Sequence, residues 1–414
     1  MFFNPCHHFV EGLPMTRSAP RSRARSGAQS ALLSILVVAL LVPVGALFAQ
    51  TWRAEGDRAD ATQRELDGVA YLRTLQQVAF AVADAQSAAV AGQPARRDAL
   101  AVAVQQADAT DARLGATLRT TERWTGIRSR LETLRSAPTG DNPLETLADY
   151  REVGDLVLAL YAKVRDESGL VHDPDGDAFH LQNSAAGELP VAVISAGRLA
   201  DVALLAAAAS APATPGRPKL QLTPDQQTQL LSQLVAERVT LVDASTRLID
   251  DLRSAVDSTE SRTLGSNLLS RLDRYQRTAD IIAVGFAQPR TSSSSGDPSM
   301  ITVLRGQLQA AAGELSSTIF NEVERLLNTR ADAIDRERML AGGAVLLAVL
   351  LAIGFFLALF LGGRPRAARP TGPFPERDPA TPPPDDATAW PTVTPIASAP
   401  QDNQSQWERS GAAR

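Results

Sequence analysis

The sequence predicts an all-α protein, in which an elongated bundle of about six helices lies between two transmembrane helices, either as one bundle or as two stacked four-helix modules. Aromatic residues make up only 5% of the chain while apolar residues make up 44%, mostly Ala, Leu and Val, a composition typical of helical bundles. Long stretches without proline place apolar residues three and four positions apart, the spacing of a bundle or coiled-coil seam. Two uncharged apolar runs are each long enough to cross a bilayer.

The first apolar run, residues 31–49, follows a basic segment and predicts an uncleaved membrane anchor. It reads ALLSILVVALLVPVGALFA and could cross a hydrocarbon core about 30 Å thick. Residues 1–30 carry four arginines against one acid, and we expect them to form a disordered basic tail. The alternative is a cleaved signal peptide, although cleavage after Ala49 would use a poor small-x-small site. Met15 is an alternative to Met1 as the start of translation.

The second apolar run, residues 339–363, is bounded by Arg338 and Arg364 and predicts a second membrane span. Arginines precede the first span and follow the second, so the positive-inside rule places both termini in the cytoplasm and residues 50–338 outside it. Residues 364–414 are Pro-rich and poor in apolar residues, and we expect a disordered cytoplasmic tail. The sequence therefore predicts a two-pass protein of the lipid bilayer with an extracytoplasmic helical domain.

Breaks in the apolar periodicity divide the extracytoplasmic region into about six helices. They fall at residues 92–94, 137–143, 168–175, 211–224 and 288–298. The fifth helix is expected to break again near Gly265. The first and last helices continue directly into the two spans, so a movement in the domain would be transmitted mechanically to the membrane.

The distribution of charge and cysteine excludes several classes of function. The region between the spans carries about eight more acidic than basic residues, so a basic surface for nucleic acid is not expected. Cys6 is the only cysteine, which excludes an intrachain disulfide and a four-thiolate zinc site. No nucleophile, base and orienting residue can be assembled from the sequence, so we expect neither an enzyme nor a cofactor.

Several segments carry a recurring pattern of residues. They are Ser168–Gln182 (SGLVHDPDGDAFHLQ), Glu188–Pro190, Gly197–Arg198, Glu65–Arg73 and Leu327–Arg338. Together they resemble the extracytoplasmic sensor region of bacterial methyl-accepting chemotaxis proteins and of related membrane-bound diguanylate cyclases and histidine kinases. The resemblance implies an input module for signal transduction in the bacterial cytoplasmic (inner) membrane.

Two features depart from that family. Its first helix often continues to His-Arg-Gly, where this chain has Ala85-Gln86-Ser87. Residues 364–414 match none of the HAMP linker, methylation helices, kinase core or cyclase domain that follow the second span in the family. The resemblance therefore implies a chemoreceptor-like sensor domain without an output of its own, and a signal that passes to a separate signalling protein.

The acidic segment within this pattern, with Asp173, Asp175 and Asp177, is interpreted as the start of a helix. A proline suits the first turn, and the carboxylates face the positive end of the helix dipole. A calcium loop of the EF-hand type is excluded, because glycine and the final acid do not fall at the positions such a loop needs. A metal site with His172, His180 and an aspartate is the alternative, and we expect no metal.

Two arginines are the candidate ligand-binding residues. Arg73 and Arg198 interrupt apolar stretches of the first and fourth helices. If their side chains point inward, their guanidinium groups could bind a small carboxylate in bidentate fashion. The alternative is that each arginine is a solvated charge or forms an intrahelical ion pair. Tyr71 is expected to lie in the core.

The sequence favours one function and leaves a second open. The first is a membrane-anchored sensor, in which a small-molecule ligand shifts the packing of the bundle and the signal passes to a partner protein. We expect a homodimer, and the small residues Gly342, Gly343 and Ala344 suit close contact of membrane helices. The second is a structural or scaffold membrane protein with a non-binding ectodomain, whose Pro-rich tail docks partners.

Overall fold

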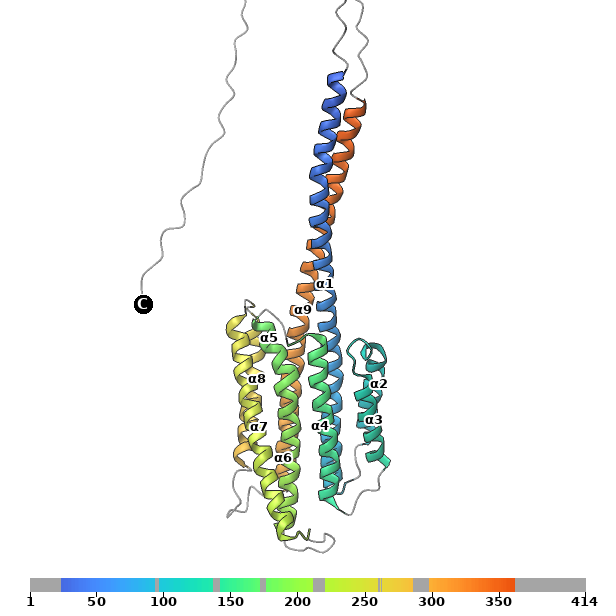
Figure 1. Ribbon diagram of the computed structural model, residues 1–414. Coiled ribbons are helices and arrows are strands. Elements are labelled where there is room, and N and C mark those ends of the chain that lie inside the picture. Colours follow the sequence, from blue (N-terminus) through green and yellow to red (C-terminus); the bar gives the residue numbers. More distant parts are fainter. Residues whose placement is uncertain are drawn as a thin grey trace, which may run out of the picture. The chain divides into compact units, whose positions relative to one another are not determined.

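The computed structural model describes residues 24–93, 97–136, 142–171, 176–210, 220–259, 261, 263–285 and 298–361. Within these residues all regular secondary structure is helical, which confirms the all-α prediction. Figure 1 shows a bundle from which the first and last helices extend together at one end.

The helices begin and end close to the predicted breaks. They are α1 (Ala24–Val90), α2 (Arg97–Leu114), α3 (Thr121–Ser136), α4 (Pro143–Ser168), α5 (Gly176–Asn183), a π-helical turn η1 (Ser184–Glu188), α6 (Leu189–Ser210), α7 (Pro224–Ser258), α8 (Leu264–Gly285) and α9 (Pro298–Leu361). The break expected near Gly265 is confirmed, because α7 ends at Ser258 and α8 begins at Leu264. The break between α2 and α3 and the π-helical turn were not predicted.

Local chemistry explains several of these ends. The Asn142 side chain accepts a hydrogen bond from the Leu144 amide, and proline follows as the first residue of α4. Gly169 ends the same helix with a φ of 87°, a conformation that other residues rarely adopt. Thr223 and Gln226 form a reciprocal capping box at the start of α7. These signals are local in the sequence, which is why the breaks could be predicted.

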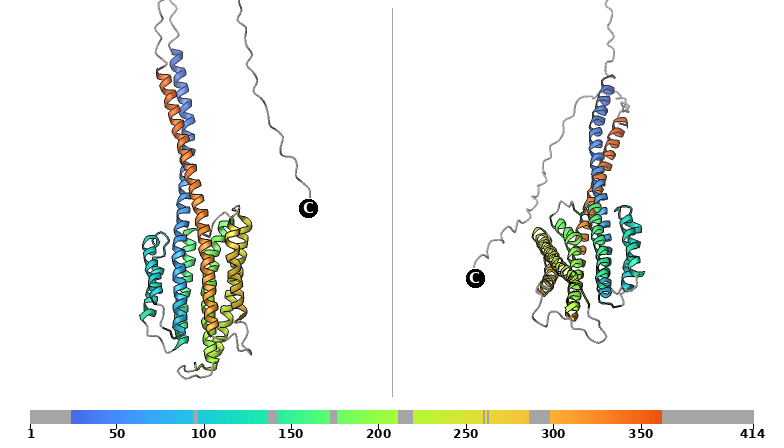
Figure 2. Two further views of the ribbon diagram at one scale, coloured as in Figure 1. Left: turned by 180° about the vertical axis from the view of Figure 1, so that it is seen from behind. Right: turned by 60° about the horizontal axis from the view of Figure 1, so that its bottom comes forward.

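The helices form two groups that lie side by side. α2 and α3 flank α1 and α4 on one side, and α7 and α8 flank α6 on the other side at the same height (Figures 1 and 2). The predicted alternative, two modules stacked end to end, is therefore wrong. The consecutive helices α1 and α2, α3 and α4, and α7 and α8 pack against each other, whereas α5, η1 and α6 follow one another without an intervening loop.

One continuous apolar core joins the two groups. Fully buried side chains come from α1, α4, α6, α7, α8 and α9, and examples are Leu75, Val157, Leu199, Leu248, Leu268 and Leu315. α1 and α4 approach each other closely at Gly68, where an added Cβ would lie 2.4 Å from the Cβ of Ser168. Tyr71 is fully buried, as predicted, and donates to the Asp111 carboxylate over 2.8 Å.

Among the described residues, three helical stretches are long and apolar enough to cross a membrane: Ser34–Val90, Gly176–Ser210 and Ser299–Ala358. The most apolar windows of the first and third are entirely unburied, whereas 72% of the window in the second is buried inside the bundle. Packing against the other helices therefore accounts for the apolar composition of α6. The exposed apolar ends of α1 and α9 suit contact with lipid.

Trp52 and Arg338 mark the level at which both outer helices become apolar. The guanidinium carbon of Arg338 lies 4.9 Å from the centre of the Trp52 ring, a cation–π contact between α9 and α1. Trp52 follows the first apolar run and Arg338 precedes the second. The two apolar ends therefore begin at the same level and run in the same direction away from the bundle.

Candidate functional site: a polar layer in the bundle

Arg198 of α6 lies inside the bundle, in agreement with the interpretation that its side chain points inward. Its residue is 7% exposed, and its Nη2 donates to the Arg151 carbonyl and to the Asp155 carboxylate of α4, each over 2.7 Å. Gly154 leaves room for this side chain, since an added Cβ would lie 2.7 Å from Nη2. α4 therefore provides both the space and the acceptors for the buried guanidinium group.

A second ion pair connects the same turn of α4 to α7. Arg151 donates to the carboxylate of Glu237, whose residue is only 4% exposed. Burial raises the pKa of Glu237, while the positive charges of Arg151 and Arg198 oppose that rise. The charged form of the buried Glu237 side chain is thus stabilised by two arginines from neighbouring helices.

Asp201 lies one turn beyond Arg198 on α6 and is fully buried. Its carboxylate accepts hydrogen bonds from Gln86 Nε2 over 2.7 Å and from Ser87 Oγ over 2.5 Å, both on α1. Burial raises the pKa of Asp201 to about 6, although the two hydrogen bonds favour the charged form. This carboxyl group can change its charge near neutral pH.

An ion pair beside Asp201 joins α1 to α9. Arg305 Nη2 donates to the Asp84 carboxylate over 2.9 Å, and Arg305 Nη1 donates to the Ala83 carbonyl over 3.3 Å. The positive charge of Arg305 lowers the pKa of Asp201, and the negative charge of Asp84 raises it. The charge on Asp201 is therefore coupled electrostatically to the contact between the two outer helices.

These residues form a connected set, which we call the polar layer. It consists of Asp84, Gln86 and Ser87 on α1, Arg151 and Asp155 on α4, Arg198 and Asp201 on α6, Glu237 on α7, and Arg305 on α9. A cavity of about 10 Å³, lined by Gln86 and Arg198 among others, connects its two halves and has room for about one water molecule. The layer links five helices through charge and hydrogen bonds, and within the described residues no group of His, Cys, Asp and Glu could hold a metal ion.

Arg73, the other candidate ligand residue, has its partners outside this layer. Its Nη2 donates to Asn321 Oδ1 and to Glu324 Oε2, each over 2.8 Å, and its guanidinium carbon lies 5.4 Å from the centre of the Phe320 ring. Its side chain is 34% exposed. Arg73 thus joins α1 to α9 closer to the apolar ends, and the structure does not bring it together with Arg198.

The acidic segment is described only in part, because Asp173 and Asp175 lie outside the described residues. Asp177 is in the first turn of α5, where its Oδ1 accepts from the Ala178 amide over 2.8 Å. Its Oδ2 accepts from Thr259 Oγ1 over 2.9 Å, at the end of α7. The side chain therefore fastens α5 to α7.

Sequence reasoning missed most of the polar layer. Asp201 and Glu237 are charged residues at positions where the helical periodicity places core residues, the same signal that singled out Arg198. Gln86 and Ser87 carry no such signal, although they stand where the chain departs from the chemoreceptor pattern. Their role depends on α6 lying beside α1, which the sequence does not reveal.

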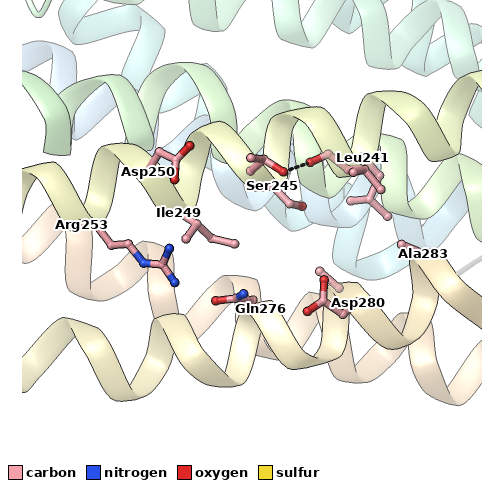
Figure 3. Close-up of a pocket in the computed structure, with 11 residues that line it drawn as sticks. Leu241, Ser245, Ile249, Asp250, Arg253, Gln276, Asp280 and Ala283 are labelled. Carbon is pink, nitrogen blue, oxygen red and sulfur yellow. Dashed lines mark hydrogen bonds between the residues drawn. The ribbon is translucent and has the colours of Figure 1, made fainter.

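Larger hollows also lie at the surface of the described bundle, among them a cleft and a groove. A cleft of about 160 Å³ runs between α7 and α8 and is lined by both apolar and charged residues (Figure 3). A wider groove of about 720 Å³ lies between α3 and α4, with Arg123 and Arg130 among its lining residues. The cleft is the more enclosed of the two.

No family model, no curated protein and no solved structure matches this chain. The function of the molecule is therefore inferred from its own residues and geometry. The polar layer, the cleft between α7 and α8 and the two apolar helix ends are the features that an account of function must connect.

Proposed function

We propose that the protein is a membrane-anchored sensor, in which an extracytoplasmic bundle responds to a stimulus and transmits it through α1 and α9 to a separate signalling partner. One observation carries the proposal. Both helices run without a break from the polar layer, where Arg305 of α9 binds Asp84 of α1, into their apolar ends. A change in the layer would shift both helices, because an α-helix transmits movement along its axis as a stiff rod.

The resemblance of five sequence segments to chemoreceptor sensor regions supports the same function. Arg198 belongs to that pattern and lies at the centre of the polar layer. The Arg-rich flanks of the apolar runs support an orientation with both termini in the cytoplasm of a bacterium and the bundle outside its inner membrane. In this orientation the bundle that encloses the polar layer lies outside the membrane, and the apolar ends reach the cytoplasmic face.

The orientation can be tested in intact cells with a membrane-impermeant maleimide. The native Cys6 is expected to react only after lysis, whereas a cysteine at the exposed Ser232 (Ser232→Cys in a Cys6→Ser background) is expected to react in intact cells. A Cys6 that reacts in intact cells while position 232 is protected would contradict the orientation.

Mechanical transmission can be tested with two spin labels. Leu32 on α1 and Leu357 on α9 are exposed and each lie about 30 Å, at 1.5 Å per residue, beyond the pair of Trp52 and Arg338. We expect Asp201→Asn in the polar layer to change the distance between labels at these two positions in nanodiscs. Ser232→Ala, which alters an exposed hydroxyl, is the matched control. An unchanged distance in the Asp201 variant would refute transmission.

A scaffold role is the second candidate, and one observation favours it. Both predicted ligand arginines are already paired within the chain, Arg73 with Glu324 and Arg198 with Asp155. A bundle held by such pairs could serve as a rigid spacer with a docking tail. The two roles differ in the spin-label experiment, because a spacer keeps the same distance between its apolar ends in all variants that remain folded.

A further inference from the structure

The cleft between α7 and α8 contains charged side chains of both signs that have no partner among the described residues. Arg253 and Asp250 of α7 and Asp280 of α8 line it, and none of them forms an ion pair or hydrogen bond within that part of the chain. Several other charges on these two helices are paired, as Asp273 is with Arg277 over 2.7 Å. The cleft therefore offers charges that an external molecule could satisfy.

The charges are arranged along the length of the cleft. Figure 3 shows Arg253 reaching between the two helices at one end, Asp280 toward the other end, and Gln276 between them. The hydrogen bond between Ser245 and Tyr275 fixes the register of the antiparallel pair. Position 253 lies eight residues from this bond in one direction and position 280 five residues in the other, so their Cα atoms are about 20 Å apart along the axis at 1.5 Å per residue.

The middle of the cleft is apolar. Leu241, Ile249 and Ala279 contribute buried or nearly buried side chains to its floor. Ala283 at the Asp280 end is also small, which leaves the cleft its volume of about 160 Å³. A small organic molecule with an apolar middle fits this floor, and a folded peptide does not fit the volume.

We infer that this cleft binds an elongated zwitterion, in which a carboxylate at one end and an ammonium group at the other are separated by a chain of methylenes. Arg253 would bind the carboxylate through its planar guanidinium group, and Asp280 would bind the ammonium group. Gln276 can hydrogen-bond either end, and the methylenes would cover Ile249. The adjacent charges of an α-amino acid are too close together to reach both Arg253 and Asp280.

The cleft is also close to the polar layer along α7. Glu237, whose carboxylate binds Arg151, lies one helical turn before Leu241 in the cleft floor. Arg238 donates from its Nε to the Ala283 carbonyl over 2.9 Å and so fastens α7 to α8 at the same level. The inference thus rests on the proposed function in one respect, since it names the ligand class of the proposed sensor.

The test uses 6-aminohexanoate and the full chain in nanodiscs, with binding measured by saturation-transfer NMR. We expect saturable binding that Arg253→Gln and Asp280→Asn each weaken by about 10-fold or more, since each removes a charge-assisted hydrogen bond. Hexanoate and hexylamine, which each lack one charged end, should bind at least about 10-fold more weakly. Arg277→Gln, which alters a paired and exposed arginine of α8, is the matched control and should bind like the native chain.

Absence of saturable binding, or equal binding by the native chain and both cleft variants, would overturn the inference. Circular dichroism of each variant distinguishes a lost contact from a lost fold. This test and the test of the proposed function can fail independently. Binding of 6-aminohexanoate without movement of the spin labels would refute the sensing function and support the binding site. Movement of the labels in the Asp201 variant without binding of 6-aminohexanoate would refute only the binding site.

Discussion

Gln86 of α1 donates a hydrogen bond to Asp201 of α6 over 2.7 Å, and the aspartate that accepts it is completely shielded from solvent. Gln86 and Ser87, the partners of this carboxylate on α1, are both neutral. Arg305, whose positive charge acts on the carboxylate, binds Asp84 instead. A buried carboxylate without its own counter-ion is costly to ionise. The stability of the bundle should therefore depend on the protonation of this one group.

The first prediction concerns the pH dependence of stability. The pKa of Asp201 is about 6 in the folded protein against a usual value of 3.8, so the folded state binds the proton more tightly than the unfolded chain. Its contribution to stability is complete below pH ~4, decreases as pH rises through about 6, and amounts to about 3 kcal/mol. Asp201→Asn cannot ionise and should remove this decrease.

Thermal melts of the full chain in detergent, followed by circular dichroism between pH 4 and pH 8, test this prediction. Other acids also titrate, so the informative quantity is the difference between the variant and the native chain at each pH. We expect the two to melt alike at the acidic end and Asp201→Asn to melt higher at pH 8. A variant that melts lower than the native chain at pH 8 would contradict the assignment.

The second prediction concerns the buried ion pair between Arg151 and Glu237. Arg151→Met leaves the carboxylate of Glu237 buried without its main partner and should cost about 3 kcal/mol in the free energy of unfolding. In the double variant Arg151→Met, Glu237→Met no charge remains unpaired at this contact. Its stability should return to within about 1 kcal/mol of the native chain.

Chemical denaturation of the single and double variants measures this coupling. The single variant Glu237→Met completes the cycle and separates the pair from effects of the methionines themselves. Additive losses in the double variant would show that the two side chains do not depend on each other.

The helix ends show what the sequence can reveal about this fold. Recognisable local signals mark three helix ends, and the helices begin or end there as predicted. They are Asn142 with Pro143 at the start of α4, Gly169 at its end, and Thr223 with Pro224 at the start of α7. The break between α2 and α3 was not predicted, although Gly115 directly follows α2 and Thr120 directly precedes α3. It depends on Arg119, which adopts a φ of 50°, and on Asp111, which accepts from Thr120 Oγ1 over 2.7 Å.

The candidate site shows where sequence reasoning stops. Arg198 was recognised because a charged residue interrupts an apolar stretch, and its burial agrees with one of the two interpretations. Its partner Asp155 lies 43 residues away and Gln86 lies 115 residues from Asp201. Such pairs depend on which helices become neighbours, and periodicity reports only which face of a helix is buried. Arg73 shows the same limit, because its partner Glu324 lies 251 residues away on α9.

The third prediction concerns the close approach of α1 and α4. A Cβ at Gly68 would lie 2.4 Å from the Cβ of Ser168, an atom that cannot move without its backbone. Gly68→Ala should therefore force the two helices apart and destabilise the protein by about 1–3 kcal/mol, despite the better helix propensity of alanine. Gly306→Ala is the matched control on α9, since an added Cβ there meets nothing within 4 Å.

The control variant should melt at the same temperature as the native chain or higher, because alanine favours a helix interior by about 1 kcal/mol over glycine. Thermal melts of the two variants under one set of conditions make the comparison. If Gly68→Ala also melted higher, the close contact between α1 and α4 would be incorrect.

The fourth prediction concerns Trp52, which is 41% exposed and lies against Arg338 where both outer helices become apolar. A tryptophan at such a boundary should sit among the lipid headgroups, where its ring meets apolar chains and its N–H meets water. In nanodiscs that carry the chain with Trp390→Phe and Trp407→Phe, which remove the two tryptophans after the second span, lipids brominated near the headgroup should quench its fluorescence more strongly than lipids brominated near the chain ends. Trp124 is buried in the bundle and donates to Asp108 over 2.8 Å, so it should contribute little to this quenching. Trp52→Phe should therefore abolish most of the quenching, and equal quenching in the variant would place the boundary of the membrane elsewhere along α1.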